Sequence, residues 1–431
     1  MKKCFHPDIL IYFLIWMTLS ATAVSGADER EDVLTWPACI KEAAEQNPDL
    51  KAAGAQVEQA EEEKNKTRSN LLPQISGSMS YQGSKSSGEG KSDSYSYGIS
   101  GSQLIFDGLK SWYSLDQSEQ SLISARLDYD LTSAEIRLNL RTAFVDLLYA
   151  QELVRITEDI AGRRRQQAAL VELRYQAGRE HRGSLLTAQA NLAQAEFDIV
   201  QARRDVDVTQ KQLQKELGRV KIAACRAEGD LELAISPLRK PDLKALAEQH
   251  PSVLKMAAQK ESARLEVKSA GSDFFPEISG TASIRRSDSD WPAEGESWSV
   301  GVSLSLPIFE GGSRVSEVYR AGAALKEAEE NERSERDSVL LSFEEAWRNL
   351  QDAHDNIGIQ RQFLEADEER AKIATAQYST GTMSFDNWII IEDNLVKSQK
   401  SYISARASAL KTEARWIYAR GGTLGFLPVD E

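Results

Sequence analysis

Four segments of the chain alternate apolar residues with small polar residues at a period of two. The alternation is clearest at 75–81 and 298–306, which read Ile-Ser-Gly-Ser-Met-Ser-Tyr and Trp-Ser-Val-Gly-Val-Ser-Leu-Ser-Leu. Because successive side chains of a strand point to opposite faces, the pattern predicts strands with one apolar and one polar face. The predicted strands cover residues 72–86, 94–106, 275–287 and 297–309.

The rest of the chain has the pattern of long helices. A large apolar residue recurs every seven residues from Leu185 to Leu213, and alanines at 188, 195 and 202 follow three residues behind. Such a heptad repeat predicts coiled-coil-like packing with close helix approach. Proline, which breaks helices, is absent from 74–236 and from 308–427. We therefore predict two long helical hairpins, 109–218 and 313–421, whose longest segments would reach about 100 Å.

These patterns occur twice, 203 residues apart. Asn-Pro at 47–48 returns as His-Pro at 250–251, Leu-Pro-Gln-Ile-Ser-Gly at 72–77 as Phe-Pro-Glu-Ile-Ser-Gly at 275–280, Ile-Phe-Asp-Gly at 105–108 as Ile-Phe-Glu-Gly at 308–311, and Tyr-x-x-Gly at 175–178 as Tyr-x-x-Gly at 378–381. A constant offset predicts one structural unit made twice. The predicted organisation is a signal peptide at 1–27, a first repeat at 28–220, an inter-repeat linker at 221–241, a second repeat at 242–422 and a tail at 423–431.

The first residues have the pattern of a secretory signal peptide. Two lysines precede an apolar run at 9–19, which is too short for a spanning helix of about 20 residues, and small residues follow. Cleavage is expected after Ala23 or Ala27. Export would place Cys39 and Cys225 in a compartment where disulfides form, and the sequence leaves open whether the two pair.

The predicted strands suit a membrane barrel with an apolar outside and a polar lumen. Four strands cannot close a barrel, because about eight are the usual minimum and an open edge in lipid leaves backbone groups unpaired. Several chains would therefore share one barrel, two chains giving eight strands and three giving twelve. A soluble four-stranded sheet at the end of a coiled-coil rod is the alternative.

Composition argues against other functions. The chain has 52 Lys and Arg against 66 Asp and Glu, a formal net charge of −14, whereas nucleic-acid binders usually carry a basic face. The four histidines lie far apart, so the sequence indicates no metal cluster and no catalytic dyad. We expect no nucleic-acid partner, no cofactor, no metal and no enzymatic activity.

The duplicated landmarks resemble those of the TolC-type outer-membrane efflux protein family, the outer membrane factors of tripartite efflux and type I secretion systems. The resemblance covers about residues 36–422. It implies an α+β membrane protein, internally duplicated, whose long antiparallel coiled-coil-like helices form an α-barrel in the periplasm. Four strands per chain would contribute to a shared 12-stranded β-barrel, in the outer-membrane lipid, of a homotrimer.

The resemblance also implies how such a channel works. A periplasmic adaptor, or membrane fusion protein, would couple the passive channel to an energised RND or ABC pump in the inner membrane. The rival hypothesis is that the chain is itself a periplasmic adaptor, or a coiled-coil scaffold without a membrane barrel.

By the same resemblance, the two turns that follow the Tyr-x-x-Gly motifs dock the adaptor. A glycine there supplies the positive φ that lets a helix end and reverse. The docking candidates are Gly178, Arg179, Arg182 and Ser184 in the first turn, and Gly381, Thr382, Met383 and Ser384 in the second.

A periplasmic gate is expected just after the second turn. In the best-known members of the family that the chain resembles, acidic residues lie six and nine positions after the second-turn glycine, where this chain has Asn387 and Ile390. The nearby acidic residues that would replace such a ring are Asp386, Glu392 and Asp393. The apolar run at 388–391 is expected to seal helix against helix near the closed end.

Overall fold

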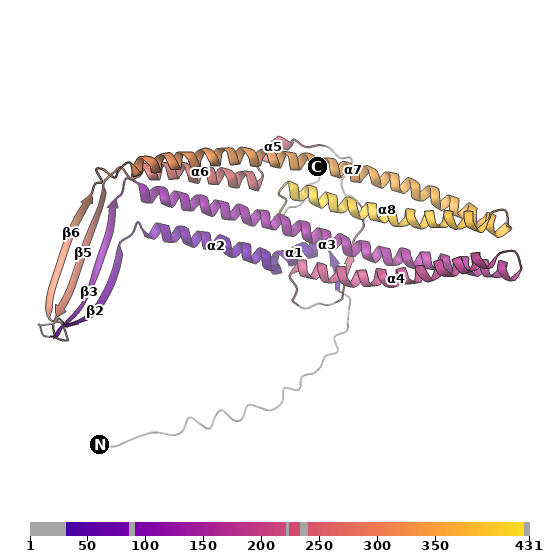
Figure 1. Cartoon of the computed structure of the whole chain (residues 1–431), viewed down its shortest axis with the longest axis horizontal. Coiled ribbons are helices and arrows are strands. Elements are labelled where there is room, and N and C mark those ends of the chain that lie inside the picture. The colour runs from indigo at the N-terminus through magenta and orange to yellow at the C-terminus, as the bar shows by residue number, and fades with distance from the viewer. Residues whose placement is uncertain (1–31, 86–90, 221–223, 233–239, 426–431) are drawn as a thin grey trace, which may run out of the picture.

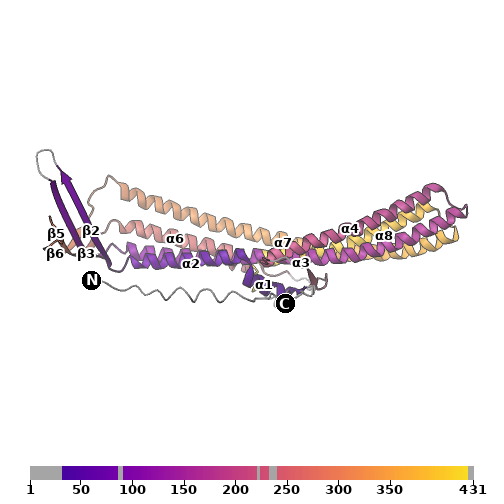
Figure 2. The ribbon, with the colours of Figure 1, turned by 90° about the horizontal axis from the view of Figure 1, so that it is seen from below.

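The chain folds into a long, gently curved rod of helices with a β-sheet at one end (Figures 1 and 2). The computed structural model describes residues 32–85, 91–220, 224–232 and 240–425. The predicted signal peptide lies outside the described residues. The predicted α+β class is confirmed, and we call the two ends of the rod the sheet end and the turn end.

Four antiparallel strands form the sheet in the order β2-β3-β5-β6. Their bounds are β2 Gln74–Lys85, β3 Lys91–Phe106, β5 Glu277–Asp288 and β6 Gly295–Ser305. All four predicted strands are present. The last ends four residues earlier than predicted, before Pro307, because proline has no N–H to donate to a ladder.

The register gives the sheet two contrasting faces. One face, which we call the apolar face, carries exposed Ile75, Met79, Ile99, Trp298, Val300 and Val302. The other, which we call the serine face, is crossed by hydroxyl pairs 2.7–2.9 Å apart: Ser76–Ser100, Ser80–Ser96, Ser279–Ser303 and Ser283–Ser299. The last two pairs are the first two displaced by 203 residues, so both repeats build the same register.

Six helices make the rod. Their bounds are α2 Pro48–Ser69, α3 Lys110–Gln176, α4 Arg182–Leu217, α6 Pro251–Ser272, α7 Ser313–Thr380 and α8 Phe385–Ala419. Helix α3 packs against α2 near the sheet end and against α4 near the turn end, and α7 packs likewise against α6 and α8. Helix α3 also contacts α6 and α8, so the two repeats pack together along most of the rod.

The heptad pattern predicts the buried seams well. Ala188, Ala195 and Ala202 of α4 are buried, as are Trp388 and Leu395 of α8. Alanine permits the close approach of α4 to α3, because only a methyl group separates the two backbones. Among the described residues, none of the helices is both apolar and long enough to cross a bilayer.

The middle of the rod holds short elements that were not predicted from the sequence. Strand β1 Asp32–Thr35 pairs in parallel with β4 Cys225–Glu228, and short helices α1 Trp36–Gln46 and α5 Leu243–Glu248 flank them. The predicted total of four strands is therefore wrong by two, and the predicted inter-repeat linker contains β4. Each missed strand has only four residues, too few for an alternating pattern to be recognised.

Cys39 and Cys225 form no disulfide within the described residues, so the pairing that the sequence left open is not formed in the structure. Cys39 and Cys225 are fully buried in the core cluster that includes Phe144 and Leu213. Burial raises the pKa of the Cys39 thiol to about 12. The Gln214 amide donates a hydrogen bond to the Cys225 sulfur at 3.3 Å, so both side chains serve as small core residues.

The beginning of the predicted tail is ordered against the rod. Leu424 is buried, and its backbone N–H donates to the Ser133 hydroxyl of α3 at 3.1 Å. The neighbouring Thr423 carbonyl accepts a hydrogen bond from the Arg137 guanidinium at 3.2 Å. These contacts hold the end of the second repeat to the longest helix of the first.

Candidate docking and gating site

Two tight turns close the helical hairpins side by side at the turn end (Figure 1). Gly178 and Gly381 adopt φ values of +67° and +83°, in the left-handed region that favours glycine. Each following N–H bonds back to the last helical turn, Arg179 to the Arg174 carbonyl at 2.8 Å and Thr382 to the Gln377 carbonyl at 2.9 Å. Such closure satisfies carbonyls that a helix end otherwise leaves free.

The next helices begin with side-chain caps. The His181 ring nitrogen Nδ1 accepts from the Ser184 N–H at 3.2 Å at the start of α4, and the Ser384 hydroxyl accepts from the Asn387 N–H at 3.4 Å at the start of α8. Capping fixes the direction in which each hairpin returns. Each turn is thus closed by backbone hydrogen bonds on one side and capped by a side chain on the other.

Most of the predicted docking residues are exposed. These are Gly178, Arg179, Arg182, Gly381, Thr382 and Ser384. Met383 is half-buried against the aromatic cluster described below. Ser184 is buried and its hydroxyl donates to Glu180 at 2.9 Å, so it supports the turn from inside.

Tyr378 joins the two turns. Its ring stacks on Trp388, with centroids 4.2 Å apart and planes at 13°, and the Arg174 guanidinium lies 4.6 Å from the ring centroid. Arg174 also donates to the Tyr378 carbonyl at 2.5 Å, and the Tyr378 hydroxyl donates to Glu180 at 3.0 Å. Burial and the hydrogen bond to Glu180 raise the pKa of Tyr378. This cluster fastens the second hairpin to the first.

Glu180 is held as a carboxylate in this cluster. Partial burial opposes its ionisation, but hydrogen bonds from Ser184 and Tyr378 outweigh burial and lower its pKa. A charge-assisted hydrogen bond is stronger than a neutral one. The link between the turns is therefore strongest when Glu180 is ionised.

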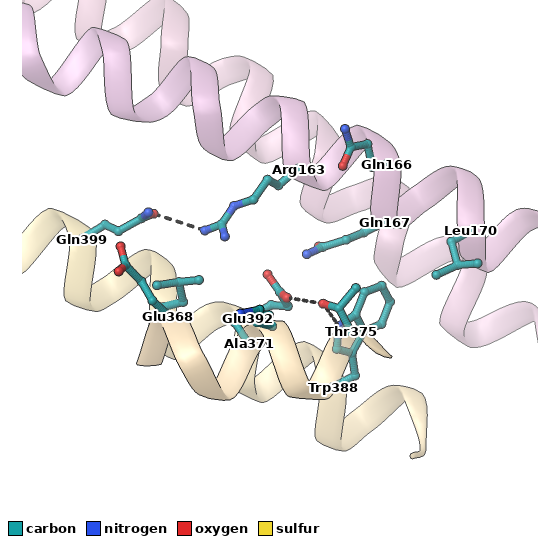
Figure 3. A pocket seen from close by; sticks show the side chains of 12 residues that line it. Arg163, Gln166, Gln167, Leu170, Glu368, Ala371, Thr375, Trp388, Glu392 and Gln399 are labelled. Carbon is teal, nitrogen blue, oxygen red and sulfur yellow. Dashed lines mark hydrogen bonds between the residues drawn. The ribbon is translucent and has the colours of Figure 1, made fainter. Parts of the chain in front are cut away.

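A cavity of about 640 Å³ lies one to three helical turns further along the rod, between α3 and the α7–α8 pair (Figure 3). Arg163 and Gln167 reach in from α3, opposite Glu368 and Thr375 of α7 and Glu392 of α8. The Trp388 indole donates to the Thr375 hydroxyl at 3.1 Å, which donates in turn to Glu392 at 3.0 Å. Arg163 donates to Gln399 at 3.3 Å across the cavity.

The predicted gate residues separate into three environments. Asp386, Asn387 and Ile390 are exposed, and the side chain of Ile390 is 56% accessible. Glu392 is buried beside Thr375, facing the cavity rather than solvent. Its neighbours Ile389 and Ile391 are partly buried and pack against the cluster that contains Trp388, so the expected helix-to-helix seal over 388–391 stays a prediction.

Asp393 forms an ion pair with Arg164 that connects α8 to α3. The Arg164 side chain is only 8% exposed and also donates to Gln167 at 3.0 Å, whereas the Asp393 side chain is 56% exposed. Lys400 of α8 also pairs with Asp198 of α4, at 2.9 Å. These links hold the second hairpin against the first close to the turn end.

Three partners in these links were not among the predicted site residues. Arg164 and Glu180 lie in a helix and beside a turn, and no local pattern marks them. Tyr378 belongs to the repeated Tyr-x-x-Gly motif, yet the two copies of that motif differ in the structure. Tyr378 is fully buried, whereas its counterpart Tyr175 is 39% exposed.

The comparisons with known proteins agree with this geometry. The profile of the family described as Outer membrane efflux protein matches residues 39–219 and 243–422, so each repeat matches separately. The chain is 24% identical to the outer membrane protein TolC of Escherichia coli K12, over 92% of this chain and 83% of TolC. It is 21% identical to the outer membrane efflux protein BepC of Brucella suis, over 94% of this chain and 88% of BepC.

The fold is shared with solved channels. The crystal structure of the open state of the MtrE outer membrane channel of Neisseria gonorrhoeae superimposes with a TM-score of 0.79, at 19% identity, over 90% of this chain and 89% of MtrE. Because the family profile covers both repeats and most of the sequence, this chain belongs to the outer membrane efflux protein family.

Proposed function

We propose that three copies of this chain form an exit duct in the outer membrane, coupled through a periplasmic adaptor to an energised RND or ABC pump. In this assembly the sheet is one third of a 12-stranded barrel in outer-membrane lipid. The helical rod is one third of a tunnel through the periplasm. The duct is passive, because the pump supplies the free energy for transport.

The observation that carries this proposal is the four-stranded sheet with two open edges. Strands β2 and β6 each have one neighbour in the described chain, and the apolar face between the edges is exposed. An open edge in hydrocarbon costs several kcal/mol per unpaired backbone group, so a sheet in lipid must close. Pairing β2 of one copy with β6 of the next closes the sheet with twelve strands.

The turn end is the proposed docking surface for the adaptor. It lies at the far end of the rod from the sheet, where a partner rooted in the inner membrane would meet it. The first turn presents Arg179 and Arg182, and the second presents the uncharged Thr382 and Ser384 followed by Asp386. Three copies would therefore alternate basic sectors with neutral-to-acidic sectors around the tunnel mouth.

The links between α3 and the α7–α8 hairpin are the proposed gate. Arg164–Asp393 and the Tyr378 cluster hold the second hairpin against the first, which keeps the mouth narrow. Adaptor docking at the turns would shift the hairpin and break these links. The proposal assigns Glu392 to the support of Trp388 through Thr375, rather than to an exposed acidic ring.

The direct test uses the mature protein purified in detergent. Its mass, corrected for bound detergent, should be three times that of the chain, and it should form channels in a planar bilayer. A monomer in detergent that never conducts would overturn the exit-duct proposal. A soluble protein that washes from membranes in alkali would point instead to an adaptor or scaffold.

A further inference from the structure

The serine face of the sheet is almost free of charge. Within the described parts of β2, β3, β5 and β6 it consists of Ser, Thr, Gly, Gln and Leu104, with two exceptions. Glu277 stands at the first position of β5, and Arg285 stands eight residues further along the same strand. Both side chains are exposed.

Arg285 is exposed on this face and has no charged neighbour directly across either ladder. Its cross-strand partners are Gly98 on β3 and Ser297 on β6, neither of which carries a charge. A Cβ at Gly98 would lie 2.4 Å from the Ile284 carbonyl oxygen and 3.2 Å from the Arg285 Cβ, so this position has no room for a side chain. Within the part of the chain that the structure describes, the Arg285 guanidinium forms no ion pair with a carboxylate.

The adjacent residue has the opposite arrangement. Arg286 lies on the apolar face and is paired with Glu296 at 2.9 Å, directly across the β5–β6 ladder. Two neighbouring arginines therefore differ in face and in pairing, one neutralised by a carboxylate and one not. This contrast supplies a matched control of equal charge one residue away.

The charge on the serine face belongs to the second repeat alone. The equivalent positions of the first repeat, 203 residues earlier, are Gln82 for Arg285 and Gln74 for Glu277, and both are neutral amides. A trimer therefore carries three arginines and three glutamates on this face, in two layers. At about 3.4 Å per residue the layers lie about 27 Å apart along the strand.

We propose that Arg285 forms a ring of three positive charges inside the barrel, near its outer mouth, that favours the passage of anions. The inference rests on the proposed trimeric duct, in which the apolar face meets lipid and the serine face lines the lumen. Glu277 lies where the sheet joins the helices, so the ring of three Arg285 side chains lies nearer the opposite edge of the barrel, toward the external loops. An anionic solute leaving the tunnel would meet this ring last.

The expected effect is substantial at low salt. Three unit charges, each about 10 Å from a passing monovalent anion in water, would concentrate that anion about eightfold before screening. Salt screens this attraction over a Debye length of about 10 Å at 0.1 M and about 30 Å at 0.01 M. The contribution of Arg285 to selectivity should therefore grow as the salt concentration falls.

The test compares reversal potentials of single channels in a KCl gradient, for the unmodified protein and for Arg285→Gln, Arg285→Lys and Arg286→Gln. We expect Arg285→Gln to lower the chloride-to-potassium permeability ratio at least about threefold near 0.01 M salt. Arg285→Lys should retain the ratio, because it keeps the charge. Arg286→Gln should also retain it, because that residue faces away from the lumen.

Three outcomes would overturn the inference. An unchanged ratio in conducting Arg285→Gln channels would show that no cationic ring acts there. An equal change in Arg286→Gln would show that the face of the sheet is irrelevant, and loss of the ratio in Arg285→Lys would exclude charge as the cause. Failure of every variant and of the unmodified protein to conduct would instead count against the exit duct itself.

Discussion

Removal of the Asp393 charge should open the channel in the absence of the periplasmic adaptor. In Asp393→Asn, Arg164 loses its carboxylate while its side chain stays 8% exposed, and only the hydrogen bond to Gln167 remains. A hydrogen bond between charged groups contributes about 1.5–3 kcal/mol, and a buried unpaired charge costs more. Asp393 is itself half exposed, which reduces the effect toward about 1–2 kcal/mol per chain.

Three such links in a trimer would together contribute about 3–6 kcal/mol to the closed state. Every 1.4 kcal/mol changes an equilibrium about tenfold, so loss of all three should raise the open fraction by a factor of about 100 or more. The assay is the open probability of single channels in a planar bilayer. Arg164→Ala should give a similar increase, because it breaks the same pair from the other side.

Asp386→Asn is the matched control. It removes the same charge from the same helix, but Asp386 is exposed and forms no ion pair among the described residues. Its open probability should stay within about twofold of the unmodified channel, as expected for an exposed charge. If Asp386→Asn opened the channel as much as Asp393→Asn, or if neither variant raised the open probability, the Arg164–Asp393 pair would not hold the channel closed.

Three further predictions concern the Tyr378 cluster and the core. Tyr378→Ala removes a fully buried ring that stacks on Trp388, so it should lower the free energy of unfolding by about 3–5 kcal/mol in thermal or denaturant unfolding. Tyr175→Ala, at the exposed counterpart, should lower it by less than about 1 kcal/mol, and equal losses would contradict the assigned packing. The pKa of Glu180 is lowered in the folded protein, so its hydrogen bond to Tyr378 is fully formed above the ordinary carboxyl pKa of about 4.3 and is lost as pH falls through the folded value. Open probability should therefore be flat from about pH 7 to 5 and rise below pH 5, and Glu180→Gln should show no such rise. A rise between about pH 7 and 5 would point to another titrating group. Because both thiols are buried, a thiol reagent at pH 8 should leave Cys39 and Cys225 unmodified in the native mature protein. The reagent should modify both after unfolding without reductant, and failure to do so would reveal a disulfide.

Much of the architecture follows from local pattern, because one face of each element is buried or contacts lipid. Alternation from Ile75 to Tyr81 predicts β2, and the heptads from Leu185 predict α4. Strands β1 and β4 escape prediction because each spans four residues and is stabilised by its partner 193 positions away rather than by its own pattern.

The candidate site is only partly visible in the sequence. The turn glycines are predictable, since helices commonly end at a left-handed residue and glycine adopts that conformation most easily. Arg164 and Asp393 are 229 positions apart, and nothing local distinguishes their pair from other charges on exposed helix faces. Tyr175 and Tyr378 share one motif, and only the packing of α7 against α8 decides that the second is buried.

The central claim, that neighbouring copies join edge to edge, can be tested by cross-linking β2 to β6. Within one chain these strands are separated by β3 and β5, hence by about 14 Å at about 4.8 Å per strand spacing. Ser78→Cys would be combined in turn with a cysteine at one of four serine-face positions of β6, and a linker with a reach of about 8 Å applied in membranes. The four positions are Ser297, Ser299, Gly301 and Ser303.

Because such a linker spans only adjacent strands, at least one combination should give a ladder of covalent dimers and trimers that stops at the trimer. Each single-cysteine parent should remain a monomer on the denaturing gel, since the native cysteines are buried. Monomers alone from all four combinations, or a ladder that continues past the trimer, would contradict a closed barrel shared by three chains.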